Sequence, residues 1–199
     1  MDANALNAEL AGMDIALLDQ VLKGRFAPGS RVADIGCGSG RNLIWFARNG
    51  FETYALDQDA GCIARVQRDV PGVHAVTGPA DALPWPAGHF QGVLCNALLH
   101  MLPDREMLHR VLHESWRVLA PGGTWFARLA TTLSMEAHAI SIGNGRYAMP
   151  GGWEVLPTTL DEMLDLTRQL GGKLLDPIKT VNVQNQRAMA TWVMTKPGS

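Results

Sequence analysis

The sequence predicts a single α/β domain with a doubly wound, mostly parallel sheet. From residue 31 to residue 129, short apolar segments typical of strands alternate with amphipathic segments typical of helices. A glycine-rich turn directly follows the first strand, and two further apolar segments end the chain. Such alternation is typical of a parallel sheet. The length of 199 residues also fits one domain with a core of its own.

Each element is predicted from hydrophobic spacing and from the residues that begin or end it. Strands are expected at 31–35, 51–56, 73–77, 90–96 and 124–129, and helices at 14–26, 42–48, 60–69, 104–118 and 159–169. The first of these helices dominates a leading segment, residues 1–28. The final apolar segments, about 173–183 and 188–195, are close enough in sequence to form an antiparallel pair.

Residues 130–158 show no clean period and are rich in glycine and proline, so we expect a long loop there. A loop of this length inside a compact domain is usually functional. We interpret it as a lid or a binding insert, although a surface loop or a dimer contact would have the same composition.

Composition excludes several classes of protein. Apolar residues make up 47% and charged residues 18%, which is typical of a globular domain. The net charge of −2 provides no surplus of cations for phosphates, so we expect no nucleic-acid partner. The three cysteines form no CxxC pair, and no apolar run is long enough for a membrane span. We therefore expect a cytoplasmic protein, monomer or homodimer, with no bound metal and no membrane contact.

The glycine turn, Gly36-Cys-Gly-Ser-Gly40, lies where α/β sheets bind ligands, beyond the carboxyl end of a strand. We expect its backbone amides, and those at the start of the following helix, to face the ligand. The spacing is GxGxG, and Arg41 stands where dinucleotide-binding loops have a third glycine, which argues against a nicotinamide cofactor. The P-loop pattern GxxxxGK[ST] is absent from the sequence.

Several spaced motifs together resemble one family. They are Ala33-Asp-Ile-Gly-Cys-Gly-Ser-Gly-Arg-Asn42, Asp57 after the second strand, Ala80-Asp-Ala-Leu-Pro84, Asn96 with His100, and Leu119-Ala-Pro-Gly-Gly123. Over roughly residues 30–130 the chain resembles the class I S-adenosylmethionine-dependent methyltransferases, and its Gly-Arg-Asn ending resembles the small-molecule, tellurite-resistance members. The resemblance implies a Rossmann-like sheet of seven strands with an antiparallel last strand and helices on both faces. It also implies S-adenosylmethionine as cofactor and S-adenosylhomocysteine as product.

The resemblance also implies the cofactor-binding residues. Asp57 would accept the ribose hydroxyls, or else only cap a helix, a role for which Asp59 is better placed. Asp34 would face the methionine end of the cofactor, or bond backbone amides of the turn. In the family, an aspartate at the position of Pro79 often contacts the adenine amino group. Because a proline stands there in this chain, the resemblance leaves the residues after Pro79 to contact the adenine. The expected cofactor-binding set is Asp34, Gly36, Cys37, Gly38, Arg41, Asn42, Asp57, Gln58, Ala80, Asp81, Ala82 and Asn96.

Catalytic and acceptor-binding residues are predicted around the end of the fourth strand. Asn96 lies where the methyl group should point, and His100 could accept a proton, or could be only a hydrogen-bonded histidine at the start of a helix. Arg41 opposes the dipole of the helix it begins, so it would pair with the cofactor's carboxylate or with an anionic acceptor, unless it is a plain surface arginine. The expected acceptor-binding set is Arg41, His100, His138, Tyr147 and Trp153.

The resulting hypothesis is methyl transfer to a small molecule. The sulfonium already activates the methyl group, so positioning is the main catalytic task. With no unmistakable base in the sequence, we favour a soft nucleophile such as a thiol, a selenol or a metalloid over an amine or hydroxyl. A non-catalytic S-adenosylmethionine-binding or interaction module is the main alternative. A protein or RNA methyltransferase and a nicotinamide oxidoreductase are weaker alternatives.

Overall fold

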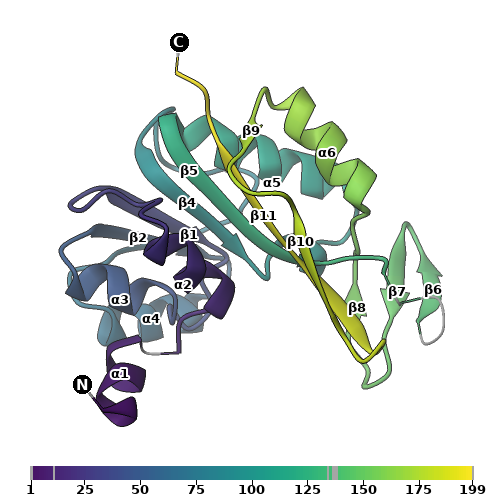
Figure 1. Ribbon diagram of the computed structural model, residues 1–199, viewed down its shortest axis with the longest axis horizontal. Helices are drawn as coiled ribbons and strands as arrows, with labels where there is room; N and C mark the ends of the chain where they lie inside the picture. The colour runs from purple at the N-terminus through teal and green to yellow at the C-terminus, as the bar shows by residue number, and fades with distance from the viewer. Residues whose placement is uncertain (1, 11, 134, 136–138, 199) are drawn as a thin grey trace.

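A twisted central sheet with helices on both faces dominates the computed structural model, and a small second sheet lies beside one end of it (Figure 1). The structure describes residues 2–10, 12–133, 135 and 139–198. The main sheet contains β1 (Arg31–Ile35), β2 (Glu52–Asp57), β3 (His74–Thr77), β4 (Phe90–Asn96), β5 (Leu119–Ala130), β9 (Lys173–Leu174), β10 (Lys179–Val183) and β11 (Arg187–Thr195).

The strand order is β10-β11-β5-β4-β1-β2-β3. Pairs among β1 to β5 are parallel, whereas β11 runs antiparallel to both β5 and β10. The expected antiparallel last strand and C-terminal pair are therefore confirmed. The eighth strand, β9, is only two residues long and pairs with the end of β11. It arises because the apolar segment expected at 173–183 is interrupted and forms two separate strands, β9 and β10.

The helices begin where polar side chains satisfy free backbone N–H groups. They are α1 (Ala3–Leu10), α2 (Ile15–Leu22), α3 (Leu43–Arg48), α4 (Ala60–Asp69), the 3-10 helix η1 (Leu99–Met101), α5 (Arg105–Val118) and α6 (Leu160–Gln169). Asp14, Asp59, Asp104 and Thr159 accept backbone N–H groups at the starts of α2, α4, α5 and α6. The predicted capping role of Asp59 is confirmed. Across the described ranges, the helices are all too short or too polar to cross a bilayer.

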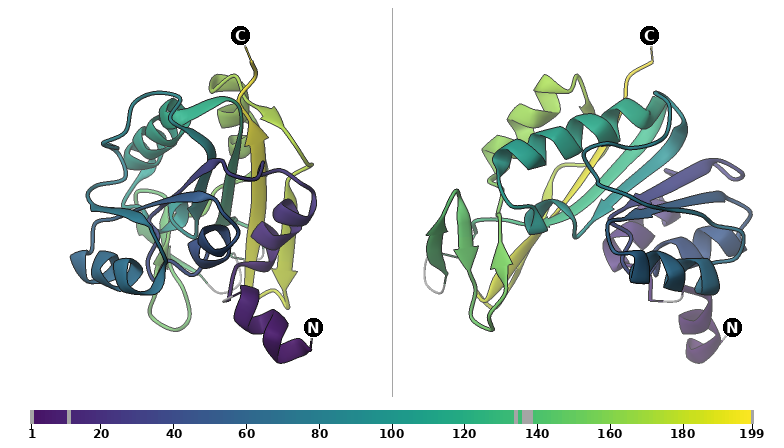
Figure 2. Two further views of the ribbon diagram at one scale, coloured as in Figure 1. Left: turned by 90° about the vertical axis from the view of Figure 1, so that its left-hand side faces the viewer. Right: turned by 180° about the vertical axis from the view of Figure 1, so that it is seen from behind.

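Two apolar clusters fill the two faces of the sheet, because successive strand residues point to opposite sides. On β1, Ala33 and Ile35 belong to a cluster with Leu112 of α5 and Met163 of α6, whereas Val32 packs in a cluster with helices α2, α3 and α4. The two further views show the helices separated in this way (Figure 2). The doubly wound architecture expected from the sequence is thus confirmed.

Residues 130–158 do not form the unstructured loop that we expected. They contain a three-stranded antiparallel sheet, made of β6 (Ile140–Gly143), β7 (Arg146–Ala148) and β8 (Glu154–Val155). Strands of two to four residues are too short to show an alternating pattern, which is why sequence spacing missed them. The small sheet packs through Met149 and Val155 against Met189 of β11, so it lies beside the tip of the C-terminal hairpin (Figure 1).

Candidate functional site

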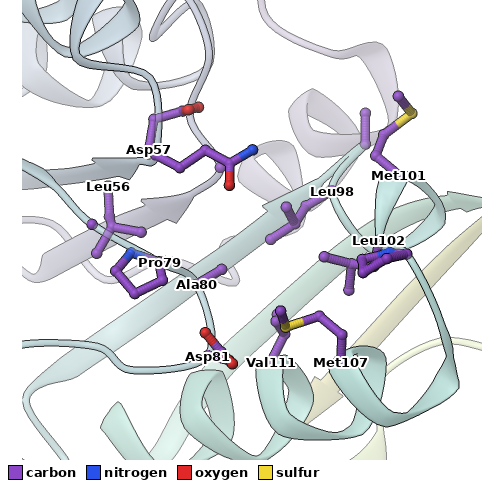
Figure 3. Close-up of a pocket in the computed structure, with 15 residues that line it drawn as sticks. Leu56, Asp57, Pro79, Ala80, Asp81, Leu98, Met101, Leu102, Met107 and Val111 are labelled. Carbon is purple, nitrogen blue, oxygen red and sulfur yellow. The ribbon is translucent and has the colours of Figure 1, made fainter.

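A cavity of about 370 Å³ opens at the carboxyl ends of the parallel strands. We call it the strand-end cavity. It is lined by Gly36, Leu56, Asp57, Gln58, Gly78, Pro79, Ala80, Asp81, Ala97, Leu98, Met101, Leu102, Pro103, Met107 and Val111. Residues after β2 and β3 form one wall, and residues from η1 and α5 form the other, with the space between them (Figure 3). One wall is therefore rich in polar groups and the other is apolar, which suits a ligand with a flat, partly polar ring system.

The glycine loop contributes space to this cavity. Gly36 has a φ of 70°, and a Cβ atom there would lie 2.8 Å from Leu98 Cδ1 across the cavity. Gly40 has a φ of 72°, and its Cβ would lie 2.9 Å from Val66 Cγ2. Both positions therefore need glycine, for backbone conformation and for close packing.

The amides of the loop do not face the ligand space as we expected. Gly36 and Cys37 both donate to the Leu56 carbonyl, at 2.8 and 3.1 Å, and Gly38 donates to Asp57 Oδ2 at 2.9 Å. The expectation is wrong for these three amides because they fasten the loop to β2. The contribution of Gly36 and Gly40 is instead steric, because the absence of a side chain avoids clashes with Leu98 and Val66.

Asp57, at the end of β2, organises the polar wall. Its carboxylate accepts the Gly38 amide and, through Oδ1, the Asp59 amide at 3.0 Å. Two backbone bonds fix the carboxylate at the cavity and leave lone pairs for further donors. Gln58 lines the cavity beside it. The geometry is that of a fixed acceptor of paired hydroxyl groups.

Asp34, in β1, is a buried carboxylate that is not among the described residues lining the strand-end cavity. It is 1% exposed, and neither of its oxygens has a hydrogen-bond partner among the described residues. Burial raises the pKa of Asp34 to about 7. The alternative role of bonding backbone amides is wrong, because no described amide reaches it. A buried acid without a partner is suited to a nearby cation.

The segment after β3 supplies the far end of the strand-end cavity. Pro79, Ala80 and Asp81 all line it, and Asp81 also accepts a hydrogen bond from Arg110 Nε at 3.0 Å. Within the described part of the chain, Ala82 is not among the residues lining this cavity.

Two other expected cofactor residues lie behind the cavity wall. Cys37 is 6% exposed, and burial raises the pKa of its thiol well above the usual range. Asn42 is buried, and its Oδ1 accepts the Asp14 amide at 3.1 Å. Neither residue is among those that line the strand-end cavity in the described ranges.

A second cavity, of about 290 Å³, lies on the other side of the end of β4. We call it the arginine cavity. It is lined by Asp14, Arg41, Asn96, Ala97, Arg128, Val181, Val183, Arg187 and Met189. The leading segment, the glycine loop, β4, β5 and the β10–β11 hairpin all contribute to it. Arg128 Nη1 lies 2.8 and 2.7 Å from the two Asp14 oxygens, and this buried ion pair joins the leading segment to β5.

Arg41 lies at this second cavity. Its Nη1 donates to the Gly12 carbonyl at 3.0 Å, and its Nη2 lies 3.8 Å from Asp14 Oδ2. Arg41 directly precedes Asn42, the N-cap of α3 (Leu43–Arg48), so the expected opposition to the helix dipole stays a prediction. The side chain is half exposed and lines the arginine cavity, so its charge is available there.

Asn96 and Ala97 form the junction between the two cavities. Ala97 lines both of them and has a φ of 60°, a conformation that is uncommon for a residue with a side chain. Asn96 lines the arginine cavity and is 7% exposed. Neither its Nδ2 nor its Oδ1 has a hydrogen-bond partner among the residues that the structure describes. Buried polar atoms of this kind point to a missing ligand.

His100 lies in η1 and is buried. It is 6% exposed, and its Nδ1 has no partner in the described part of the chain. Burial lowers the pKa of His100 to about 4. It is not among the described residues that line either cavity. Its catalytic role therefore stays a prediction.

The structure places Tyr147 and Trp153, two residues expected to enclose the acceptor, on or beside the small sheet. Trp153 is 38% exposed and lies at a small hollow that Arg187 and Met189 also line, which places it next to the arginine cavity. Tyr147 of β7 packs against the apolar cluster of Met149 and Val155. His138 lies outside the described residues.

Sequence reasoning missed most residues of the arginine cavity. Arg128 carried a visible signal, since it is a charged residue in the otherwise apolar end of β5. Arg187 and Asp14 carried none, because only the fold brings the two ends of the chain to this cavity. The apolar wall of the strand-end cavity, with Leu98 and Met107, was also missed.

Comparison with known proteins supports one family. A family model described as a methyltransferase domain matches residues 32–123, the segment that carries the glycine loop, Asp57 and the junction at Asn96. The comparisons support a class I S-adenosylmethionine-dependent methyltransferase. An uncharacterized methyltransferase of Synechocystis is 29% identical over 143 residues, covering 70% of this chain and 66% of the relative.

Two further methyltransferases extend the comparison. A ubiquinone biosynthesis O-methyltransferase of Xanthomonas campestris is 30% identical over 153 residues, covering 73% of this chain and 62% of the relative. The chain thus spans less than two thirds of the length of either relative. The crystal structure of a methyltransferase from Methanosarcina mazei superimposes with a TM-score of 0.78 at 17% identity, covering 90% of this chain and 98% of the other, which shows the shared fold. The finer resemblance to the tellurite-resistance members stays a prediction.

Proposed function

We propose that this protein transfers a methyl group from S-adenosylmethionine to a small-molecule acceptor. The single observation that carries the proposal is the junction at Ala97, where the strand-end cavity and the arginine cavity share a lining residue. A donor in the first cavity and an acceptor in the second would meet there. When the methyl donor needs no activation by the protein, holding the two reactants together is the main source of rate enhancement.

The residues present fit the cofactor. Asp57 is fixed to accept the two ribose hydroxyls, and Ala80 and Asp81 line the end of the cavity where an adenine would lie. Asp34 is buried, and neither of its oxygens has a hydrogen-bond partner among the described residues; it would provide a negative charge for a cationic ligand once its proton is lost. When bound, the sulfonium supplies an electrophilic methyl group. The chain's own task is to orient the acceptor at Asn96 and to exclude water.

The residues around the junction favour an acceptor that needs no strong base. Asp14 is held in an ion pair with Arg128. The pKa of His100, about 4, makes its imidazole a weak proton acceptor at neutral pH. A thiol, selenol or metalloid, already nucleophilic, suits such a site better than an amine or a neutral hydroxyl.

Two features support a small acceptor. The arginine cavity, at about 290 Å³, has the size of a site for a small molecule. The Xanthomonas relative is named for the biosynthesis of ubiquinone, itself a small molecule. We further propose that the chain is one catalytic domain and that residues 130–158, with Tyr147 and Trp153, close over the acceptor.

The test is transfer of an isotope-labelled methyl group from S-adenosylmethionine into fractionated pools of small metabolites, proteins and RNA. We expect label in the small-molecule pool, and none there with Asp57→Ala. Label only in protein or RNA would contradict the small acceptor. Binding of S-adenosylhomocysteine without transfer to any pool would favour the alternative, a non-catalytic binding module.

A further inference from the structure

The arginine cavity has a charge that the methyl-transfer chemistry does not require. Arg41, Arg128 and Arg187 line it together with a single acid, Asp14, so two positive charges remain in excess. We propose that the cavity binds a carboxylate of the methyl acceptor, which makes the acceptor a small organic acid. The proposal rests on the proposed function and identifies the class of its acceptor.

The three arginines are not equivalent. Arg128 is engaged with both oxygens of Asp14, and Arg41 is bound to a backbone carbonyl. The Arg187 side chain makes no hydrogen bond or ion pair with any residue in the described ranges, although it lines the cavity. Its guanidinium keeps all its donors for a ligand, and a planar fork of donors matches the two oxygens of a carboxylate.

Asn96 provides a second and independent sign of a ligand. It is buried, it lines the same cavity, and both polar atoms of its amide are without a partner among the described residues. Leaving such atoms unpaired costs free energy unless a ligand satisfies them. Asn96 and Arg187 therefore line the same cavity, and both have polar atoms without a partner among the described residues.

The sheet sets the distance between the reacting centre and the anchoring charge. Asn96 pairs in register with Arg128 on β5, and Arg128 pairs with Thr191 on β11, so Arg187 lies four residues farther along β11. Two steps between neighbouring strands amount to about 10 Å, and four residues along a strand amount to about 13 Å. The long Arg187 side chain can bridge part of this span, so the acceptor's carboxylate would lie several bonds from its nucleophile.

A carboxylate fits this cavity better than the other anions available. A phosphate dianion would lie close to the Asp14 carboxylate and would be repelled more strongly than a singly charged group. The carboxylate of the cofactor itself would belong nearer the glycine loop after β1, and β1 lies three strands from β11. Arg187 is thus placed for the acceptor.

The first measurement separates the acceptor's carboxylate from that of the cofactor. Calorimetry compares S-adenosylhomocysteine with methylthioadenosine, which lacks the amino-acid carboxylate, on the wild type, Arg187→Gln and the control Arg65→Gln on exposed α4. We expect each nucleoside to bind with the same affinity to all three proteins. A loss confined to S-adenosylhomocysteine in Arg187→Gln would overturn the proposal. Failure of the wild type to bind either nucleoside would instead refute the proposed function.

The second measurement uses anions directly. Protein saturated with S-adenosylhomocysteine is titrated with succinate, succinamide and inorganic phosphate, followed by NMR shifts of residues around Asn96. We expect saturable succinate binding, about tenfold weaker in Arg187→Gln and unchanged in Arg65→Gln, with succinamide weaker still. Equal succinate binding in wild type and Arg187→Gln, no succinate binding at all, or tighter binding of phosphate would each overturn the assignment.

Discussion

The two cavities are built in different ways. The strand-end cavity takes its polar wall from short segments directly after β1, β2 and β3, and its apolar wall from η1 and α5. The arginine cavity is assembled from the leading segment, the end of β5 and the C-terminal hairpin. One site is local to neighbouring loops, and the other exists only when the ends of the chain come together. The cavity that we propose for the donor thus depends on neighbouring loops, whereas the cavity that we propose for the acceptor depends on segments far apart in the sequence.

The largest expected effect tests how the arginine cavity is held together. Arg128→Met leaves the Asp14 carboxylate, only 7% exposed, without the guanidinium that contacts both of its oxygens, and the nearest remaining cation among the described residues is Arg41 at 3.8 Å. Breaking a buried pair from one side costs about 3 kcal/mol of the free energy of unfolding. Urea denaturation should show this loss, and the double variant Asp14→Asn with Arg128→Met should recover part of it. Arg168→Met, in an exposed pair with Asp165, is the control, with a change below about 1 kcal/mol.

The second prediction tests whether the strand-end cavity binds the adenosine part of the cofactor. Asp57→Ala should weaken S-adenosylhomocysteine and methylthioadenosine alike, by about 100-fold, because charged hydrogen bonds to the ribose are lost. Calorimetry measures both ligands, with the exposed Asp69→Ala as control. Thermal unfolding of Asp57→Ala checks that the glycine loop, which bonds Asp57, stays folded. An affinity within threefold of wild type would contradict the assigned role.

The third prediction concerns Asp34 and pH. Its pKa is about 7 in the folded protein against 3.8 ordinarily, so between pH 4 and 7 the folded state keeps a proton that the unfolded chain has released. Stability is therefore lost as pH rises through this window. Asp34→Asn should be more stable than wild type by about 2 kcal/mol at pH 8 and nearly equal at pH 4. Parallel stability–pH curves for the two proteins would contradict a buried, protonated Asp34.

The smallest expected effect tests whether Trp153 belongs to the edge of the arginine cavity. Trp153 lies beside Arg187 but is partly exposed. Trp153→Ala should weaken succinate binding by about threefold and leave S-adenosylhomocysteine binding unchanged, because only the rim of one cavity is altered. Ile142→Ala, on the same small sheet, is the control and should change neither. A loss of cofactor affinity in Trp153→Ala would show that the small sheet serves the donor site.

The same contrast explains what sequence could predict. The glycine loop, Asp57 and Asp81 were predictable because each follows a strand at a short, recognisable spacing. Arg187 could not be assigned, since one exposed arginine looks like any other until the hairpin brings it to the same cavity as Asn96. The small sheet at 140–155 was missed because its strands are too short to show a period. Local chemistry was visible in the sequence, whereas pairing between distant segments was not.

The most direct test of the whole account is a crystal structure with S-adenosylhomocysteine bound. We predict the adenosine in the strand-end cavity, the ribose hydroxyls on Asp57, and the sulfur beside Ala97, facing the arginine cavity. A nucleoside bound among Arg41, Arg128 and Arg187 instead would contradict the division of the site into a donor cavity and an acceptor cavity.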